Sequence, residues 1–101
     1  MNISINGKTY ESYKITASMT RRALELNVEA LDAAAAAEKL KATQDAQEAS
    51  ELLALVGPNL DAKAELVCDA FGNAFTRAAL LDAVSNAELN GLIQAIARGK
   101  N

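Results

Sequence analysis

Few residues of this chain could do chemistry, and two carboxylates are the first candidates. Asp61 and Glu65 are four residues apart, so on a helix they would lie one turn apart, as acid–base pairs sometimes do. They share a polar helix face with Lys63 and Asp69, which favours a solvated surface over a catalytic pair. For Cys68, the only cysteine, an apolar helix face and the neighbouring Asp69 predict a raised pKa of the thiol. That direction is wrong for a nucleophile, so we interpret Cys68 as a small residue in or near the core.

Motifs of catalysis and metal binding are missing from the sequence. It contains no histidine, which is the commonest general base and transition-metal ligand. It also lacks the glycine-rich phosphate loops, the HExxH zinc motif and a CxxC pair. Lys8, Lys14, Arg21 and Arg22 are candidates for a minor anion-binding patch, but ordinary surface charge explains them equally well. We therefore expect no enzyme activity, no metal and no cofactor.

Charge and hydropathy argue against two classes of partner. Ten basic and thirteen acidic residues give a net charge of −3, whereas nucleic-acid binding needs a positive surface. No purely apolar run is longer than that from Ala33 to Ala37, which is far shorter than a membrane span. The first ten residues do not have the pattern of a signal peptide, and a single cysteine suits a reducing compartment. We expect a cytoplasmic protein that binds neither nucleic acid nor membrane.

Alanine dominates the apolar composition. Of the 101 residues, 22 are alanine and only four are aromatic. Alanine favours helix but buries little area, so helices form easily while the core stays thin. Such a chain often gains stability by self-association. We expect one mainly α domain, a small bundle of four to five helices with a short N-terminal β-hairpin, which forms a homo-oligomer.

Residues 1–15 have the pattern of a β-hairpin arm. Asn6-Gly7 is a strong hairpin signal, because both residues tolerate the positive φ angles of a type I′ turn. A two-residue loop places Ile5 opposite Lys8 and Ile3 opposite Tyr10. A lone hairpin is marginal in water, so we expect a helix or another subunit to cover its apolar side chains.

Residues 16–56 form either one long helix or a helical hairpin. Thr16, Ser18 and Thr20 are all possible N-caps of the first helix. An apolar stripe then recurs at helical spacing, but charged residues interrupt it in the middle of the segment. We favour a break within residues 42–45, with Thr43 or Asp45 as the second cap.

Residues 59–98 are expected to form a C-terminal subdomain of three short helices. Gly57-Pro58 indicates a helix boundary, after which Asn59 can cap a new helix that Gly72 closes. Thr76 can cap a second helix. Ser85 and Glu88 have the spacing of a capping box, which would begin the last helix.

Two sets of apolar residues are candidates for contacts with proteins. The phenylalanines flank a short turn, and the first interpretation is that both rings hold the C-terminal helices together. The alternative is that one ring, with nearby leucines, lies in an exposed groove for a partner segment. The candidate partner-binding residues are Phe71, Phe75, Leu80, Leu81, Leu89 and Leu92. The candidates for self-association are Ile3, Ile5, Tyr10, Leu24, Val28 and Leu31.

The stretch "FGNAFTRAALLDAVSNAEL", residues 71–89, resembles the phage tail assembly chaperones of long, flexible-tailed phages and related prophages. Members often carry a Phe-Gly pair, two more residues, then Phe-Thr and a helix of the form xxxLLDx. Many also begin with a short INGKxY segment, matched here by residues 5–10. The two matches cover about a third of the chain, and the alanine-rich middle, residues 28–50, matches neither.

The resemblance implies a non-enzymatic role in building a phage tail. Such chaperones bind the long, hydrophobic, helix-rich tape measure protein, keep it soluble in the host cytoplasm and help recruit tail tube subunits. They are displaced as the tube polymerises and are absent from the mature virion. Alternatives from other classes are a small helical oligomeric regulatory or antitoxin-like module, or a structural tail component retained in the particle.

The resemblance also implies ribosomal frameshifting. In this family a −1 frameshift near the end of the reading frame commonly makes a second, longer product. Gly99-Lys100-Asn101 can be encoded by GGA, AAA and AAC, which contain the slippery heptamer A AAA AAC. We expect an extended form that contacts the tail tube protein. The simpler interpretation is that Gly99 ends the last helix and a polar tail follows.

Overall fold

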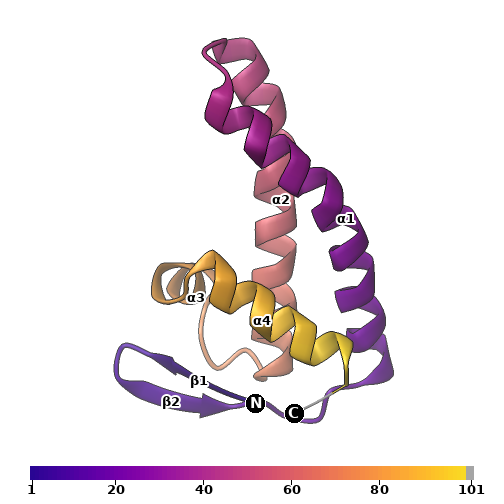
Figure 1. Ribbon diagram of the computed structural model, residues 1–101. Helices are drawn as coiled ribbons and strands as arrows, with labels where there is room; N and C mark the ends of the chain where they lie inside the picture. The colour runs from indigo at the N-terminus through magenta and orange to yellow at the C-terminus, as the bar shows by residue number, and fades with distance from the viewer. Residues whose placement is uncertain (100–101) are drawn as a thin grey trace.

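The computed structural model describes residues 1–99, and Lys100 and Asn101, with the part of the frameshift hypothesis that concerns them, lie outside the described residues. Its elements follow the chain as two strands and four helices (Figure 1). They are β1 (Asn2–Ile5), β2 (Lys8–Glu11), α1 (Ala17–Ala42), α2 (Ala46–Ala70), α3 (Arg77–Ala83) and α4 (Asn86–Ala97). The prediction of a mainly α fold with four to five helices and an N-terminal hairpin is confirmed.

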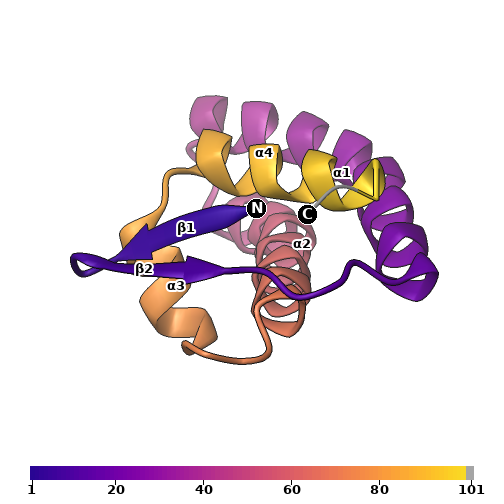
Figure 2. The same ribbon diagram turned by 90° about the horizontal axis from the view of Figure 1, so that it is seen from below.

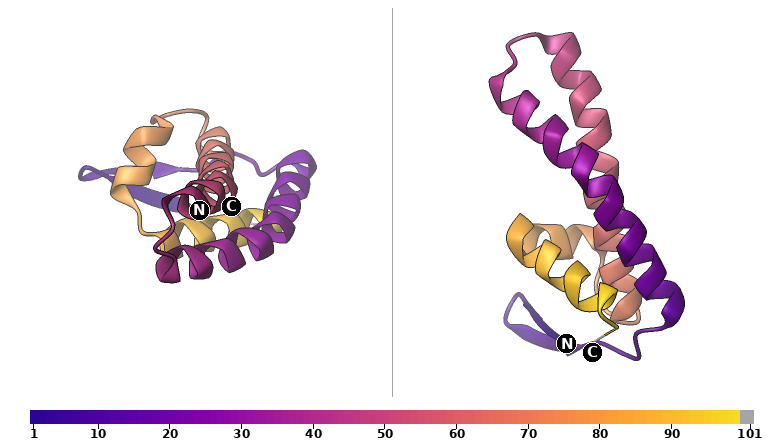
Figure 3. Two further views of the ribbon diagram at one scale, coloured as in Figure 1. Left: turned by 90° about the horizontal axis from the view of Figure 1, so that it is seen from above. Right: turned by 45° about the vertical axis from the view of Figure 1, so that its right-hand side comes forward.

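The two long helices form an antiparallel hairpin that sets the shape of the molecule. The chain measures 43 × 29 × 17 Å, and α1 alone, with 26 residues, spans about 39 Å. The connected ends of α1 and α2 project well beyond the two short helices, as the right-hand view of Figure 3 shows. Helix α4 packs against both α1 and α2, in the half of the helical hairpin that lies away from the connected ends (Figure 1). Helix α3 packs against α2.

The β-hairpin lies at the base of the molecule, beneath α3 and α4 (Figure 2). Its register pairs Ile3 with Tyr10 and Ile5 with Lys8, as the two-residue turn predicts. Asn6 and Gly7 have φ angles of 54° and 81°, because a turn of this kind needs the left-handed region at both positions. Ile3 and Ile5 are buried within the chain itself, and β1 contacts α3.

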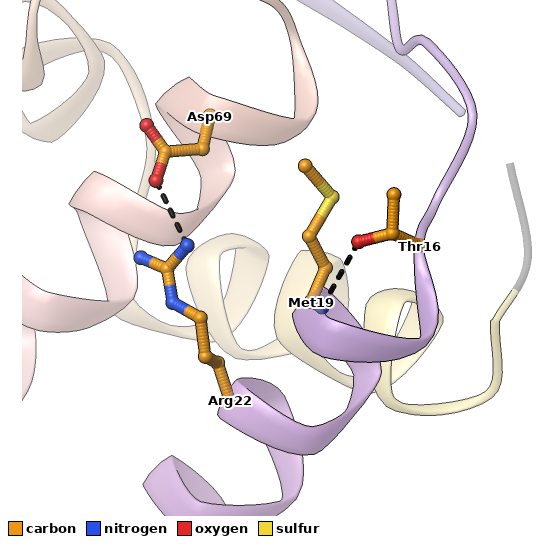
Figure 4. Close-up of polar contacts among 4 residues, drawn as sticks. All are labelled: Thr16, Met19, Arg22 and Asp69. Atoms are coloured by element: carbon orange, nitrogen blue, oxygen red, sulfur yellow. Dashed lines mark hydrogen bonds and ion pairs between the residues drawn. The ribbon is translucent and has the colours of Figure 1, made fainter.

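Side chains cap the helix N-termini where the sequence offers suitable residues. The Thr16 hydroxyl accepts a hydrogen bond from the Met19 N–H at 3.2 Å, which identifies Thr16 among the three possible caps of α1 (Figure 4). Asp45 caps α2, and the expected break between the two long helices is confirmed. Thr76 caps α3, and Ser85 with Glu88 forms the expected capping box of α4.

The predicted helix boundary at Gly57-Pro58 is wrong. Helix α2 runs without a break from Ala46 to Ala70 and contains Pro58 in its interior. The proline removes one backbone hydrogen bond, at a cost of up to about 3 kcal/mol. Helix α2 packs against α1, and this tertiary packing outweighs the local preference. Asn59 is therefore not an N-cap but a buried residue in the middle of α2.

The core lies where α2, α3, α4 and the hairpin meet. The largest fully buried side chains come from α2, the following turn, α3 and α4, and they are Phe71, Leu66, Leu80, Leu89, Ile93, Ile96 and Val67. Helix α1 contributes chiefly small side chains, including Ala23, Ala33 and Ala36. The Thr20 hydroxyl donates to the Ile96 carbonyl at 3.0 Å, which joins the start of α1 to the end of α4.

Candidate functional site

Asp61, Glu65 and Cys68 lie as the sequence suggests. Asp61 and Glu65 are both exposed on α2. Cys68 is buried, and burial raises the pKa of its thiol, with a further contribution from the negative charge of Asp69. A raised thiol pKa and burial both disfavour the thiolate, so this geometry does not make Cys68 a nucleophile.

Most of the candidate anion-binding cations have partners within the chain. Arg22 donates to Asp69 across α1 and α2 at 2.9 Å (Figure 4). Arg21 pairs with Glu25 at 3.1 Å. The Lys8 ammonium lies 5.3 Å from the centroid of the Tyr10 ring. These contacts agree with ordinary surface charge, and among them the Arg22–Asp69 pair joins α1 to α2.

The candidate partner-binding residues are mostly in the core. Phe71 and Phe75 are 1% and 9% exposed, and their ring centroids lie 5.4 Å apart. Leu80 and Leu89 are fully buried, whereas Leu81 and Leu92 are half-buried. The edge of the Tyr10 ring meets Phe75 at 5.1 Å, so the β-hairpin completes the same cluster. This burial agrees with the packing interpretation of the two phenylalanines.

The Phe71-Gly72 pair, which is part of the family resemblance, follows the end of α2 and lies against Tyr13. Gly72 and Asn73 have φ angles of 67° and 58°, in the left-handed region that ends many helices. The Tyr13 ring packs directly over Gly72, where a Cβ atom would overlap it. The Tyr13 N–H donates to the Ala70 carbonyl at 2.9 Å. Glycine is thus required at position 72 by both backbone and packing.

One face of α1 carries large apolar side chains that this chain does not cover. Leu24, Val28 and Leu31 are 52%, 68% and 73% exposed and recur at steps of four and three residues, which places them on one face. We call these three residues the α1 stripe. On α2, Leu53 and Leu55 are also more than half exposed, near the projecting end of the helical hairpin.

A groove of about 350 Å³ lies between α1, α2 and α4, and we call it the three-helix groove. Its α1 wall is mainly alanine, its α4 wall is entirely amide side chains, and α2 contributes both apolar and polar groups. The lining residues are Asn27, Ala30, Ala33, Ala34 and Ala37 from α1, Val56, Asn59, Leu60 and Lys63 from α2, and Asn86, Asn90 and Gln94 from α4.

Lys63 is the charged residue of this groove, and its position corrects the sequence interpretation. The residue is only 5% exposed, although its sequence context placed it on a polar face. Its ammonium donates to Asn90 Oδ1 at 2.9 Å, and burial lowers the pKa of the Lys63 side chain. The missed signal was spacing, since position 63 lies three residues from both Leu60 and Leu66, inside the apolar period of α2.

Asn59 is the second buried polar residue of the groove. Its side-chain amide donates to the Leu26 carbonyl of α1 at 3.4 Å, a long hydrogen bond between the two long helices. Within residues 1–99, no group of three or more His, Cys, Asp and Glu side chains is arranged to hold a metal ion. No helix in the same residues is both long and apolar enough to cross a membrane.

The fold and these surfaces are those of a small helical domain with an exposed apolar helix face and an amide-lined groove, features suited to contacts with other proteins. A family model described as phage tail chaperone protein matches residues 1–100. The chain belongs to this family, and its role is that of a phage tail assembly chaperone. No curated protein and no solved structure matched the chain with statistical significance.

Proposed function

We propose that this chaperone binds the tape measure protein of its phage and keeps it soluble until the tail tube assembles around it. Membership of the tail chaperone family supports the proposal, because it assigns the chain to tail assembly. The observation that carries it is the α1 stripe, in which three large apolar side chains on one face are more than half exposed. An apolar helix of the client can bury its side chains against such a face.

The surroundings of the stripe favour binding that is reversible. The same helix face continues toward Ala35, and alanine adds little buried area to a contact. Contacts of this kind are shallow, so each chaperone would hold the client weakly and many copies would be needed along it. Weak binding suits a chaperone that must leave when tail tube subunits arrive.

In this proposal the chain also associates with itself through the α1 stripe. Ile3 and Ile5 are buried inside the chain and Tyr10 is half-buried, so the exposed candidates are Leu24, Val28 and Leu31. A second copy and a client helix would therefore compete for the α1 stripe, unless the contacts involve Leu53 and Leu55. Light scattering of the chaperone alone, with and without the stripe substitutions below, measures how far copies associate.

The later steps are proposed from the family role. The complex forms in the host cytoplasm, and a frameshift-extended product contacts the tail tube protein while the shorter product coats the client. The chaperone is then released and absent from the finished particle. The protein inventory of purified virions tests release. The nucleotide sequence at codons 99–101, with an open −1 frame beyond it, tests frameshifting.

Co-purification tests client binding. The tagged chaperone is co-expressed with the tape measure protein, and we expect both proteins in the soluble eluate. Replacing Leu24, Val28 and Leu31 by glutamine should remove the client while leaving the fold unchanged, because all three side chains are exposed. A matched control replaces three exposed charged residues of the same helix, in Glu29→Gln, Asp32→Asn and Lys39→Gln. Equal recovery of client by both variants would contradict the role of the stripe.

A further inference from the structure

The three-helix groove contains a buried cation without an anionic partner. Within the described chain, carboxylates pair with Arg21, Arg22 and Lys41, and no carboxylate lies within ion-pair distance of Lys63. An ammonium group has three N–H donors, and the Lys63 ammonium donates within the described chain to Asn90 Oδ1. Two donors are therefore left for another group. Burying a charge without an opposite charge is costly, so a structural role alone is a poor explanation for this lysine.

The walls of the groove are suited to a peptide. None of the lining residues is acidic, so nothing within the groove would repel an anion. Asn86, Asn90 and Gln94 follow one another at steps of four residues, about 6 Å apart along α4, and each amide can both donate and accept hydrogen bonds. These groups can pair with the backbone of a bound segment. The α1 wall is mainly alanine, and its short side chains allow a bound segment with small side chains to approach closely.

We propose that the three-helix groove binds a segment of the tape measure protein in which an Asp or Glu side chain is flanked by small residues. The carboxylate accepts hydrogen bonds from the Lys63 ammonium, while the amides of α4 bind the adjacent backbone. This site deepens the client binding proposed above and depends on it. It adds a polar, sequence-selective contact to the apolar contact of the α1 stripe.

The groove is preorganised for an anion. Folding has already removed most of the Lys63 side chain from water, so an incoming carboxylate meets a cation that is held in place by Asn90. Charge-assisted hydrogen bonds of this kind are stronger than neutral ones. The volume of about 350 Å³ lies at the small end of the range for ligand sites, which suits a few side chains rather than a whole helix.

Peptide binding by the full-length chaperone tests the site. Overlapping peptides that span the tape measure protein of the same phage are labelled and titrated by fluorescence anisotropy. Each acidic peptide that binds is also made with Asp→Asn or Glu→Gln. We expect the neutral peptide to bind about tenfold or more weakly, as expected for loss of a charge-assisted hydrogen bond. The Lys63→Gln chaperone should bind both peptides alike, whereas the control Lys39→Gln, an exposed lysine of α1, should keep the preference.

A second measurement does not depend on any variant. In the wild type, the side-chain amide NMR signals of Asn86, Asn90 and Gln94 should shift when the acidic peptide is added, and those of Asn2 and Asn6 in the β-hairpin should not. Equal binding of acidic and neutral peptides, or a preference that persists in Lys63→Gln, would overturn the site. Unshifted α4 amides would do the same.

The failure of the site and the failure of the proposed function give different results. If wild-type and Lys63→Gln chaperones recover the full-length client equally well, the groove assignment is wrong but client binding stands. If neither recovers the client and no acidic peptide binds, both proposals fall together.

Discussion

Gly72→Ala tests the turn that ends α2, which is the part of the chain where sequence resemblance and geometry coincide. Gly72 has a φ of 67°, and alanine in this left-handed region costs about 1–2 kcal/mol. The smaller entropy of the unfolded alanine chain returns about 0.4–1 kcal/mol. The new Cβ would also lie within 3 Å of the Tyr13 ring, which must move.

The displaced ring adds a modest cost. Tyr13 is 68% exposed, so it loses roughly a third of a full burial, about 0.5–1 kcal/mol. Together the terms predict that Gly72→Ala lowers the free energy of unfolding by about 1–2 kcal/mol, or Tm by about 5 °C or more. Gly91→Ala is the matched control, because Gly91 lies inside α4 with no atom near its Cβ position, and it should stabilise the chain by about 0.5–1 kcal/mol.

Thermal and denaturant unfolding of both variants, followed by circular dichroism, measures the difference. A Tyr13→Ala substitution in each background separates the two causes, since the cost of losing the ring should disappear once Gly72→Ala has already displaced it. If Gly72→Ala were as stable as Gly91→Ala, the left-handed turn would not be required. If the costs of Gly72→Ala and Tyr13→Ala simply added, the ring would not cover this glycine.

Three further substitutions test the core, the long helix and the buried lysine. Phe71→Ala should lower the free energy of unfolding by about 3–5 kcal/mol, because the ring is fully buried. This loss is a large part of the stability expected for a small domain, about 5–15 kcal/mol. Unchanged melting would place Phe71 outside the core. Pro58→Ala restores a backbone N–H donor inside α2 and should stabilise the chain by up to about 3 kcal/mol. A lower Tm would indicate that Pro58 stabilises the fold at this position. Burial lowers the pKa of Lys63 below its ordinary value of 10.5, so the folded chain loses this proton at a lower pH than the unfolded chain. The free energy of unfolding of the wild type relative to Lys63→Gln should therefore rise with pH between the lowered pKa and 10.5, and a flat difference in denaturant titrations would contradict the burial of its charge.

The parts of the fold that local chemistry determines were predictable from the sequence. The Asn6-Gly7 turn sets the register of the hairpin, and Ser85 with Glu88 sets the start of α4. The break before α2 follows from Asp45, whose side chain accepts from the Gln47 and Glu48 N–H groups. In each case the turn conformation or the capping hydrogen bonds involve residues close in sequence, so no distant contact is needed to determine the local structure.

The parts that depend on distant contacts were not predictable in the same way. Gly57-Pro58 has the chemistry of a helix end, yet packing of α2 against α1 carries the helix through it. Lys63 has the chemistry of a surface residue, yet the three-helix groove encloses it because α4 folds back across α2. The groove is built from three segments far apart in the chain, and no local pattern of charge or hydropathy brings them together.

The solubility of the tape measure protein measures the chaperone activity most directly. The purified client is diluted from denaturant into buffer with increasing amounts of chaperone, and the fraction left in solution after centrifugation is determined. We predict that this fraction rises with the ratio of chaperone to client and then saturates. The chaperone with Leu24, Val28 and Leu31 replaced by glutamine should leave the client aggregated, while the charged-residue control should act like the wild type. A soluble fraction that does not depend on the chaperone would show that this chain does not keep the client in solution.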